Sequence, residues 1–168
     1  MNRLPLALMS AGLLCFAAGQ AFAAQLSQQD QTFVREASQT NLAEISEGQL
    51  AVQKGASQTV KQMGETLITD HRQSEDQLRQ IAQQQGFTVP QSPSQQQQSQ
   101  ASALAQETGA GFDRTFATDE VMGHEKSISE FKKEATSTQD PALRSYAETT
   151  IPVLEKHLKM ARMARRGG

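Results

Sequence analysis

The sequence predicts an all-α fold, a four-helix bundle with a long crossover between the second and third main helices. Two observations carry this prediction. Apolar residues recur at intervals of three and four along four long segments, and no segment alternates as a half-buried strand would. Glycines and prolines fall between these segments, where helices end and connections begin.

The first 23 residues have the features of an export signal that is removed from the mature protein. Arg3 supplies a positive charge, an apolar run follows from 6 to 18, and Ala-Phe-Ala at 21–23 is typical of a cleavage site. Cleavage there leaves 145 of the 168 residues, 24–168, a length that suits one domain. We therefore expect a periplasmic protein. Its single cysteine, Cys15, is lost with the signal, so the mature chain has no thiolate ligands.

The charge balance and the hydropathy exclude two classes of partner. The chain has 16 basic and 18 acidic residues, and non-specific nucleic-acid binding needs a concentrated basic surface. No segment after the signal approaches the roughly 20 apolar residues of a membrane span. We expect neither nucleic acid as a partner nor a transmembrane segment. An envelope protein is the kind of partner that export suggests, and the oligomeric state stays open.

The first two helices have clear boundaries. Ser27 is a good N-cap for a first helix that runs to about Lys54, where Gly55 breaks the pattern. Ser57 can cap the second helix. Gly86 then provides a typical C-terminal stop.

Residues 86–111 are predicted to form the crossover. Pro90 and Pro93 mark an irregular beginning, and a run of glutamines follows. The segment 94–100 is either helical or a low-complexity disordered stretch, while the apolar residues around Leu104 favour a short helix.

The third main helix is expected from about Phe112 to Ala135. The fourth begins with Asp140 as N-cap and Pro141 at the first helical position, where proline is tolerated. Pro152 lies inside this helix and should bend it. Four amphipathic helices with a long second connection favour a bundle of the ferritin-like kind.

Polar side chains interrupt the apolar stripe of every main helix. His71, His124 and His157 lie on the core-facing stripes of the second, third and fourth helices, and Glu44 lies on that of the first. Burying such groups without partners is costly. They therefore form either a polar layer in which they satisfy one another or a site that surrounds a ligand.

The spacing around the histidines argues against a ferritin-type di-metal oxidoreductase. Such sites use Glu-x-x-His motifs on two helices. Here Ile68, Val121 and Leu154 stand three residues before the histidines. A histidine-rich set suits a single zinc, copper or similar ion better, with Glu120, one turn before His124, as a further candidate ligand.

Helix lengths predict the depth of each group in the bundle. His71, His124 and Glu44 lie about 11–14 residues from the same end, so they can meet. His157 lies about 7 residues from that end, a spread of about 10 Å in all, so we expect it either to need a shift of its helix or to belong elsewhere.

The residues thus allow three functions. A non-enzymatic envelope or stress-related module with a buried His/Glu layer is the first, because no nucleophile, phosphate loop or dinucleotide motif is present. The alternative is a periplasmic protein that binds one transition-metal ion (zinc, copper or iron) through Glu44, His71, His124 and His157. A di-metal oxidoreductase is less favoured. We assign no catalytic residue.

Several short motifs are distinctive: Asn41-Leu42-Ala43-Glu44-Ile45 with Gly48, Asp70-His71, Phe112-Asp113-Arg114, His124-Glu125-Lys126 and Leu154 to Leu158. Together they resemble one exported bacterial family, catalogued as domain of unknown function 4142 and described as predicted outer-membrane or periplasmic proteins. The resemblance extends from about Gln29 to Ala161. It implies a bacterial, periplasmic, ferritin-like bundle, and it implies no settled activity.

Overall fold

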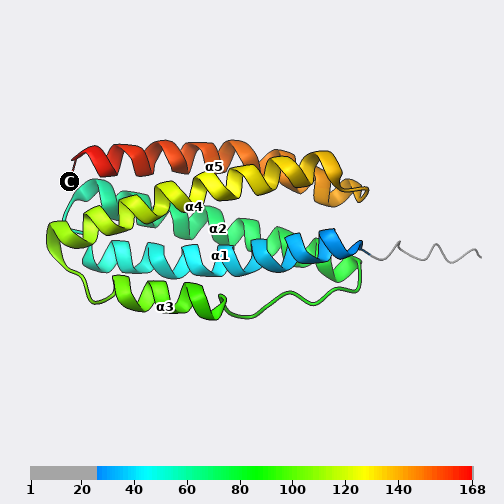
Figure 1. Ribbon diagram of the computed structural model, residues 1–168, viewed down its shortest axis with the longest axis horizontal. Coiled ribbons are helices and arrows are strands. Elements are labelled where there is room, and N and C mark those ends of the chain that lie inside the picture. The colour runs from blue at the N-terminus through cyan, green and yellow to red at the C-terminus, as the bar shows by residue number, and fades with distance from the viewer. Residues whose placement is uncertain (1–25, 168) are drawn as a thin grey trace, which may run out of the picture.

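The computed structural model describes residues 26–167, and this part of the chain contains five helices and no strand. The predicted export signal, 1–23, lies outside the described residues. The helices are α1 (Gln28–Lys54), α2 (Gln58–Gln84), α3 (Gln95–Leu104), α4 (Gly109–Ser137) and α5 (Pro141–Gly167). The predicted all-α four-helix bundle with a long crossover is confirmed, since α1, α2, α4 and α5 form the bundle and α3 lies in the crossover (Figure 1).

The bundle consists of two antiparallel helix pairs. α1 packs along α2 and α4 packs along α5, while α2 also contacts α5 and α1 contacts α4. The crossover returns the chain along the length of the bundle, so α2 and α4 run in the same direction (Figure 1). No helix among residues 26–167 is long and apolar enough to cross a membrane.

The predicted N-caps are confirmed. Ser27 and Asp30 form a capping box, in which the Ser27 hydroxyl accepts from the Asp30 amide at 3.1 Å. Ser57 accepts from the amide of the third residue of α2. Asp140 accepts from two amides of α5 at 2.9 Å each. Pro152 does not end α5, which is helical throughout.

The glutamine-rich crossover segment is helical. Ser94 caps α3 and forms a capping box with Gln97, which satisfies the free amides at the start of a short helix. The side chain of Gln97 donates to Thr40 on α1 at 3.4 Å, and Leu104 at the other end of α3 is buried. These contacts hold α3 against the outer side of α1.

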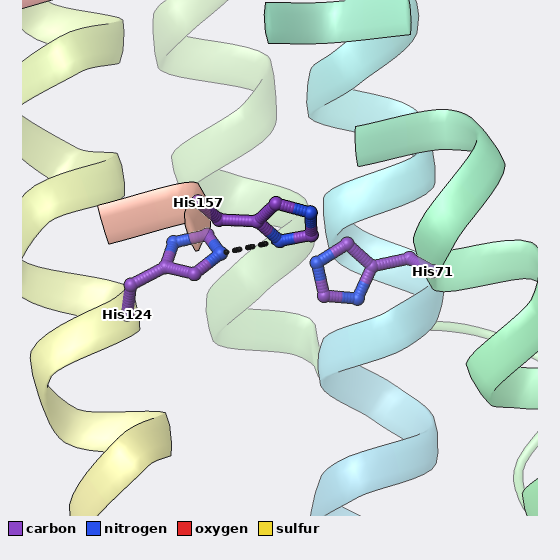
Figure 2. A group of neighbouring side chains, drawn as sticks. All are labelled: His71, His124 and His157. Carbon is purple, nitrogen blue, oxygen red and sulfur yellow. Dashed lines mark hydrogen bonds between the residues drawn. The ribbon is translucent and has the colours of Figure 1, made fainter. Parts of the chain in front are cut away.

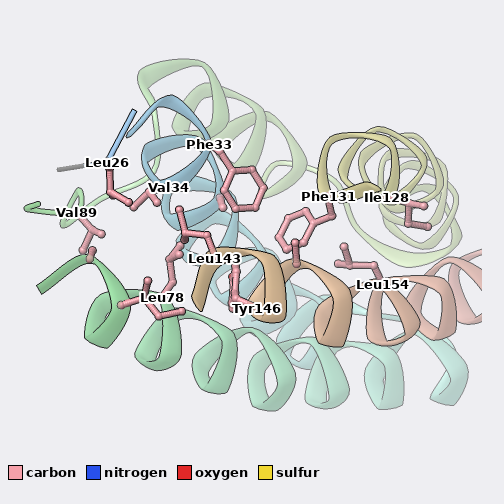
Figure 3. Close-up of a cluster of buried hydrophobic side chains, with 14 residues drawn as sticks. Leu26, Phe33, Val34, Leu78, Val89, Ile128, Phe131, Leu143, Tyr146 and Leu154 are labelled. Carbon is pink, nitrogen blue, oxygen red and sulfur yellow. The ribbon is translucent and has the colours of Figure 1, made fainter. Parts of the chain in front are cut away.

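Two apolar clusters fill the bundle, one on each side of the histidines. The first lies near the start of α1 and includes an edge-to-face pair of Phe33 and Phe131, with ring centroids 5.0 Å apart (Figure 3). The second lies near the start of α4 and includes the stacked rings of Phe112 and Phe116. Along α2, α4 and α5 each histidine falls between residues of the two clusters. The polar residues therefore form a layer across the middle of the core.

α1 and α2 approach closely at Gly48 and Gly64, just beside this layer. A Cβ atom on Gly64 would lie 2.6 Å from the backbone oxygen of Gly48, and the reverse distance would be 2.8 Å. Only glycine fits such a contact between two backbones. The two helices that carry Glu44 and His71 are thus held at short range.

Candidate metal centre

The three histidines of the chain meet in the middle of the bundle (Figure 2). His71 comes from α2, His124 from α4 and His157 from α5, and each is at most 4% exposed. One ring nitrogen of each lies within 4.8 Å of those of the other two. Their ring centroids are 5.2 to 6.0 Å apart.

The expectation that His157 needs a shift of its helix or belongs elsewhere is wrong. Nδ1 of His157 is 3.3 Å from Nε2 of His124. α5 extends to Gly167, so His157 lies deeper in the bundle than the sequence alone predicts. In addition, helical side chains tilt toward the N-terminus of their helix. α5 runs opposite to α2 and α4 (Figure 1). This tilt therefore brings the ring of His157 toward the other two.

The outer nitrogen of His71 is held by an amide. Nδ1 lies 3.0 Å from Oδ1 of Asn41. The amide nitrogen of Asn41 donates to Glu75 at 3.4 Å and to the hydroxyl of Tyr146 at 3.5 Å, which leaves its oxygen for the histidine. His71 therefore carries its proton on Nδ1, and the lone pair of the neutral ring lies on Nε2.

The other two histidines are held by oxygen atoms that can only accept hydrogen bonds. Nδ1 of His124 is 2.9 Å from the backbone oxygen of Glu120, one turn earlier on α4. Nε2 of His157 is 2.8 Å from a carboxylate oxygen of Asp70. Burial alone would raise the pKa of Asp70, but hydrogen bonds from His157 and Lys156 hold this pKa below its usual value. Both outer nitrogens therefore carry protons, and the lone pairs of the neutral rings lie on Nε2 of His124 and Nδ1 of His157.

The three remaining nitrogens point toward one another. Nε2 of His71 has no hydrogen-bond partner within residues 26–167 and faces the other two rings (Figure 2). Two lone pairs 3.3 Å apart, on His124 and His157, require a proton or a metal ion between them. Two imidazole nitrogens bound to one tetrahedral ion at about 2.0–2.1 Å are themselves about 3.3–3.4 Å apart. The observed spacing thus suits either occupant.

A proton is the competing occupant in the protein without metal. Burial lowers the pKa of His124, but the carboxylates of Glu44 and Glu120 outweigh burial and raise the pKa to about 9. Burial lowers the pKa of His157 to about 4, against the opposing effect of Asp70. Burial, together with His124 and His157, lowers the pKa of His71 well below its usual value. The single imidazolium is thus His124, which can donate to His157.

Two carboxyl groups lie beside the histidines. An oxygen of Glu44 is 4.0 Å from Nε2 of His71, and Glu44 is 7% exposed. Glu120 lies 3.3 Å from Nδ1 of His124 and is 2% exposed. Ligand atoms of Glu44, Glu120 and His124 lie within 4.8 Å of one another. All four candidate ligands from the sequence, and Glu120, are therefore brought together in one layer.

The groups that orient the rings were not predicted from the sequence. Asn41 and Asp70 occur in the motifs that carry the family resemblance, but no role was assigned to them. Asp70 directly precedes His71 in the sequence, yet its partner is His157 on another helix. A carboxylate on a helix edge beside an inward histidine is a signal that could have drawn attention to it.

Fold and site together define a helical bundle with a buried set of potential metal ligands. Residues 15–164 match the family described as "Domain of unknown function (DUF4142)", and the chain belongs to this family, as the sequence motifs predicted. A search of curated proteins found no match.

Two solved structures are similar. A "DUF305 fragment from Deinococcus radiodurans" is 12% identical, with a TM-score of 0.74, and the match covers 85% of this chain and 99% of that one. "CopM in the Cu(II)-bound form" is 21% identical, with a TM-score of 0.70 and coverage of 82% and 96%. At these identities the likeness shows that the fold is shared.

Proposed function

We propose that this protein binds one transition-metal ion of the copper or zinc type through His71, His124 and His157, with Glu44 as the fourth ligand. One observation carries the proposal. In each histidine, one ring nitrogen donates a hydrogen bond to an acceptor on the outer side, and the second ring nitrogen points inward. Metal-binding histidines have this arrangement, in which an outer acceptor fixes the tautomer and the orientation of the ring.

The ligand types narrow the choice of ion. Three imidazoles and one carboxylate suit Zn²⁺ in tetrahedral geometry, and sites of this type bind Cu²⁺ more tightly than Zn²⁺. CopM, a protein of similar fold, is described in a Cu(II)-bound form, which makes copper the first ion to test. Missing Glu-x-x-His motifs favour a single ion over a di-metal oxidase centre.

The pattern of residues 1–23 supports export to the periplasm. We propose that the chain is cleaved after Ala23 and that the mature protein works in the periplasm of a bacterium, as an envelope protein of the ferritin-like group. The charged, apolar and small-residue regions of 1–23 support cleavage. Mass spectrometry of the periplasmic fraction tests it, with the mature N-terminus expected at Ala24.

The decisive test uses variants that keep each outer hydrogen bond and remove the inward lone pair. Asparagine at 71 or 124 places an amide donor near the position of Nδ1, and glutamine at 157 places one near Nε2. We expect the mature protein, purified without chelator or histidine tag, to hold about one metal ion per chain. His71→Asn, His124→Asn and His157→Gln should each lower metal affinity by more than about 100-fold.

Ser127→Ala is a matched control, because Ser127 lies one turn after His124 on α4 in the same layer. It should bind metal as the wild type does. The chain has only three histidines, so no other imidazole can replace them. Elemental analysis that finds no metal, with no binding of added copper or zinc, would overturn the proposal.

A polar layer of structural importance is the second candidate function. Its support is that each ring has a hydrogen-bond partner within the protein. In that case the protein is a non-enzymatic module whose surface carries its function. The histidine variants would then lose stability by the same amount with and without added metal.

A further inference from the structure

A cavity of about 470 Å³ lies between α1, α3 and α4 and leads from the surface to the polar layer. Acidic side chains mark its path. Asp119 and Glu47 line it, and Glu44, the carboxylate next to His71, lines it as well. Gly123 also lines it and leaves space in front of Glu44, since even a Cβ atom there would be 3.9 Å from the carboxylate.

Glu44, which lines the cavity, and Glu120, which has a carboxylate oxygen within 4.8 Å of one of Glu44, are both buried and short of partners. Glu120 is 2% exposed, and neither of its oxygens accepts a hydrogen bond from any described residue. Its nearest cationic neighbour is the His124 ring, 3.3 Å away. One oxygen of Glu44 is likewise without a partner in the described part of the chain. Buried carboxylates are costly unless they are paired, protonated or bound to a cation.

The charges around the cavity reinforce one another. Ligand atoms of Glu44 and Glu120 lie within 4.8 Å of each other, and the carboxylates of Glu47 and Asp119 line the same cavity as Glu44. Mutual repulsion of this kind is relieved by a divalent cation placed between the carboxylates.

We propose that Glu44 and Glu120, with Glu47 on the access side, form a second cation site, which takes an oxygen-preferring divalent ion such as Mn²⁺ from this cavity. The site is separate from the three histidines, and it does not depend on metal binding there. Glu44 has two oxygens and can serve both sites. Nδ1 of His124 donates to the Glu120 backbone and is therefore not a ligand of this second ion.

Manganese titration, followed by the loss of the EPR signal of free Mn²⁺, tests the proposal on the full mature chain. The background is the double variant His71→Asn/His157→Gln, which removes the histidine site and leaves the carboxylates intact. We expect this protein to bind about one Mn²⁺. Adding Glu120→Gln should weaken Mn²⁺ binding at least tenfold, and adding Glu47→Gln should weaken it less.

Glu125→Gln is the matched control, because Glu125 is an exposed carboxylate next to His124 that pairs with Arg162 on the outer face. It should leave Mn²⁺ binding unchanged. Glu120→Asp keeps the charge on a shorter side chain, and we expect it to bind more tightly than Glu120→Gln. Circular dichroism confirms that each variant is folded before it is compared.

The results separate this site from the histidine site. Absence of Mn²⁺ binding in both the wild type and the double variant would overturn the carboxylate site, whatever the outcome with copper. Equal binding by folded Glu120→Gln and Glu125→Gln would overturn it too, since the ion would then lie on surface carboxylates. Mn²⁺ binding that depends on Glu120, in a protein that takes no copper or zinc, would support this site and overturn the proposed function.

Discussion

At the scale of single residues, three different acceptors orient the three histidines. His71 is held by the side-chain amide of Asn41, His124 by a backbone carbonyl of its own helix, and His157 by the carboxylate of Asp70. The carboxylate is the strongest of these acceptors, because a charge-assisted hydrogen bond is shorter and stronger than a neutral one. Asp70 should therefore contribute most to ring orientation and to the basicity of the inward nitrogen.

Asp70→Asn tests this contribution. We expect metal affinity to fall about 10–100-fold while the helical content is unchanged, because the ring of His157 loses its charged acceptor. A competition titration against a chelator measures the change. Lys156→Gln is the control, since Lys156 also contacts Asp70, at 3.2 Å, but lies on the surface. An Asp70→Asn protein with wild-type affinity would show that Asp70 only satisfies a buried histidine.

Individual residues of the site were predictable only in part. Helical periodicity places His71, His124 and Glu44 inside because the stripe of a helix repeats every three to four residues. Which ring nitrogen faces inward depends on partners from other helices, and the sequence does not indicate how these helices are rotated. The hydrogen bond from His157 on α5 to Asp70 on α2 is an example of such a contact between helices.

At the scale of elements, helix ends were predicted well because their chemistry is local. Ser27, Ser57 and Asp140 each cap a helix by accepting, through the side chain, from a backbone amide only two or three residues further along the chain. The start of α4 was less accurate. The helix begins at Gly109 and not near Phe112. Its first turn contains two glycines, and their low helix propensity gave no local signal for an earlier start.

The junction of α1 and α4 provides a pH-dependent test. Glu134 on α4 lies beside Asp30 of the capping box, and burial followed by the interaction with Asp30 raises the pKa of Glu134 to about 7 from 4.5. The folded state therefore binds an extra proton between about pH 4.5 and 7, so this group makes the protein less stable as the pH rises through that window.

Glu134→Gln should remove this effect. We expect the variant to be more stable than the wild type by about 1–2 kcal/mol at pH 8 and to lose this advantage below about pH 5. Urea unfolding at both pH values measures it. Glu130→Gln, one turn earlier and paired with Lys126 on the surface, is the matched control. A pH-independent difference between Glu134→Gln and the wild type would contradict the assignment.

At the scale of the whole molecule, the polar layer divides the core into two apolar clusters. Four helices contribute to the layer, through Glu44, His71, His124 and His157, so an ion bound there would connect all of them. Binding to the folded state alone would then stabilise the entire bundle and not one helix.

We therefore expect saturating copper or zinc to raise the melting temperature of the wild type. A metal concentration 100 times the dissociation constant corresponds to about 2.7 kcal/mol, or a shift of about 5–10 °C for a chain of this size. Calorimetry with and without metal measures the shift. The double variant His71→Asn/His157→Gln should show almost none, and an equal shift in both proteins would mean that metal stabilises the bundle at other places.

The architecture was predictable because it depends on patterns that each segment carries by itself. Four amphipathic segments and one long connection specify a four-helix bundle in which the second and third main helices are parallel. The depth of His157 in the bundle was not predictable, because it depends on the length of α5 and on the opposite tilt of side chains in antiparallel helices. The cavity under α3 was not predictable from the sequence either, since it lies where the crossover helix covers the space between α1 and α4.

The hydrogen bonds of Asn41 have a consequence for spectroscopy. Asn41 joins His71 to Tyr146, and Tyr146 is the only tyrosine of a chain that has no tryptophan. Burial raises the pKa of Tyr146 to about 12, so its phenol stays protonated at ordinary pH. The ultraviolet emission of the chain therefore comes almost wholly from a buried ring, separated from the candidate metal ligand by one amide. Quenching by copper and a smaller change with zinc would make the unlabelled protein its own optical sensor.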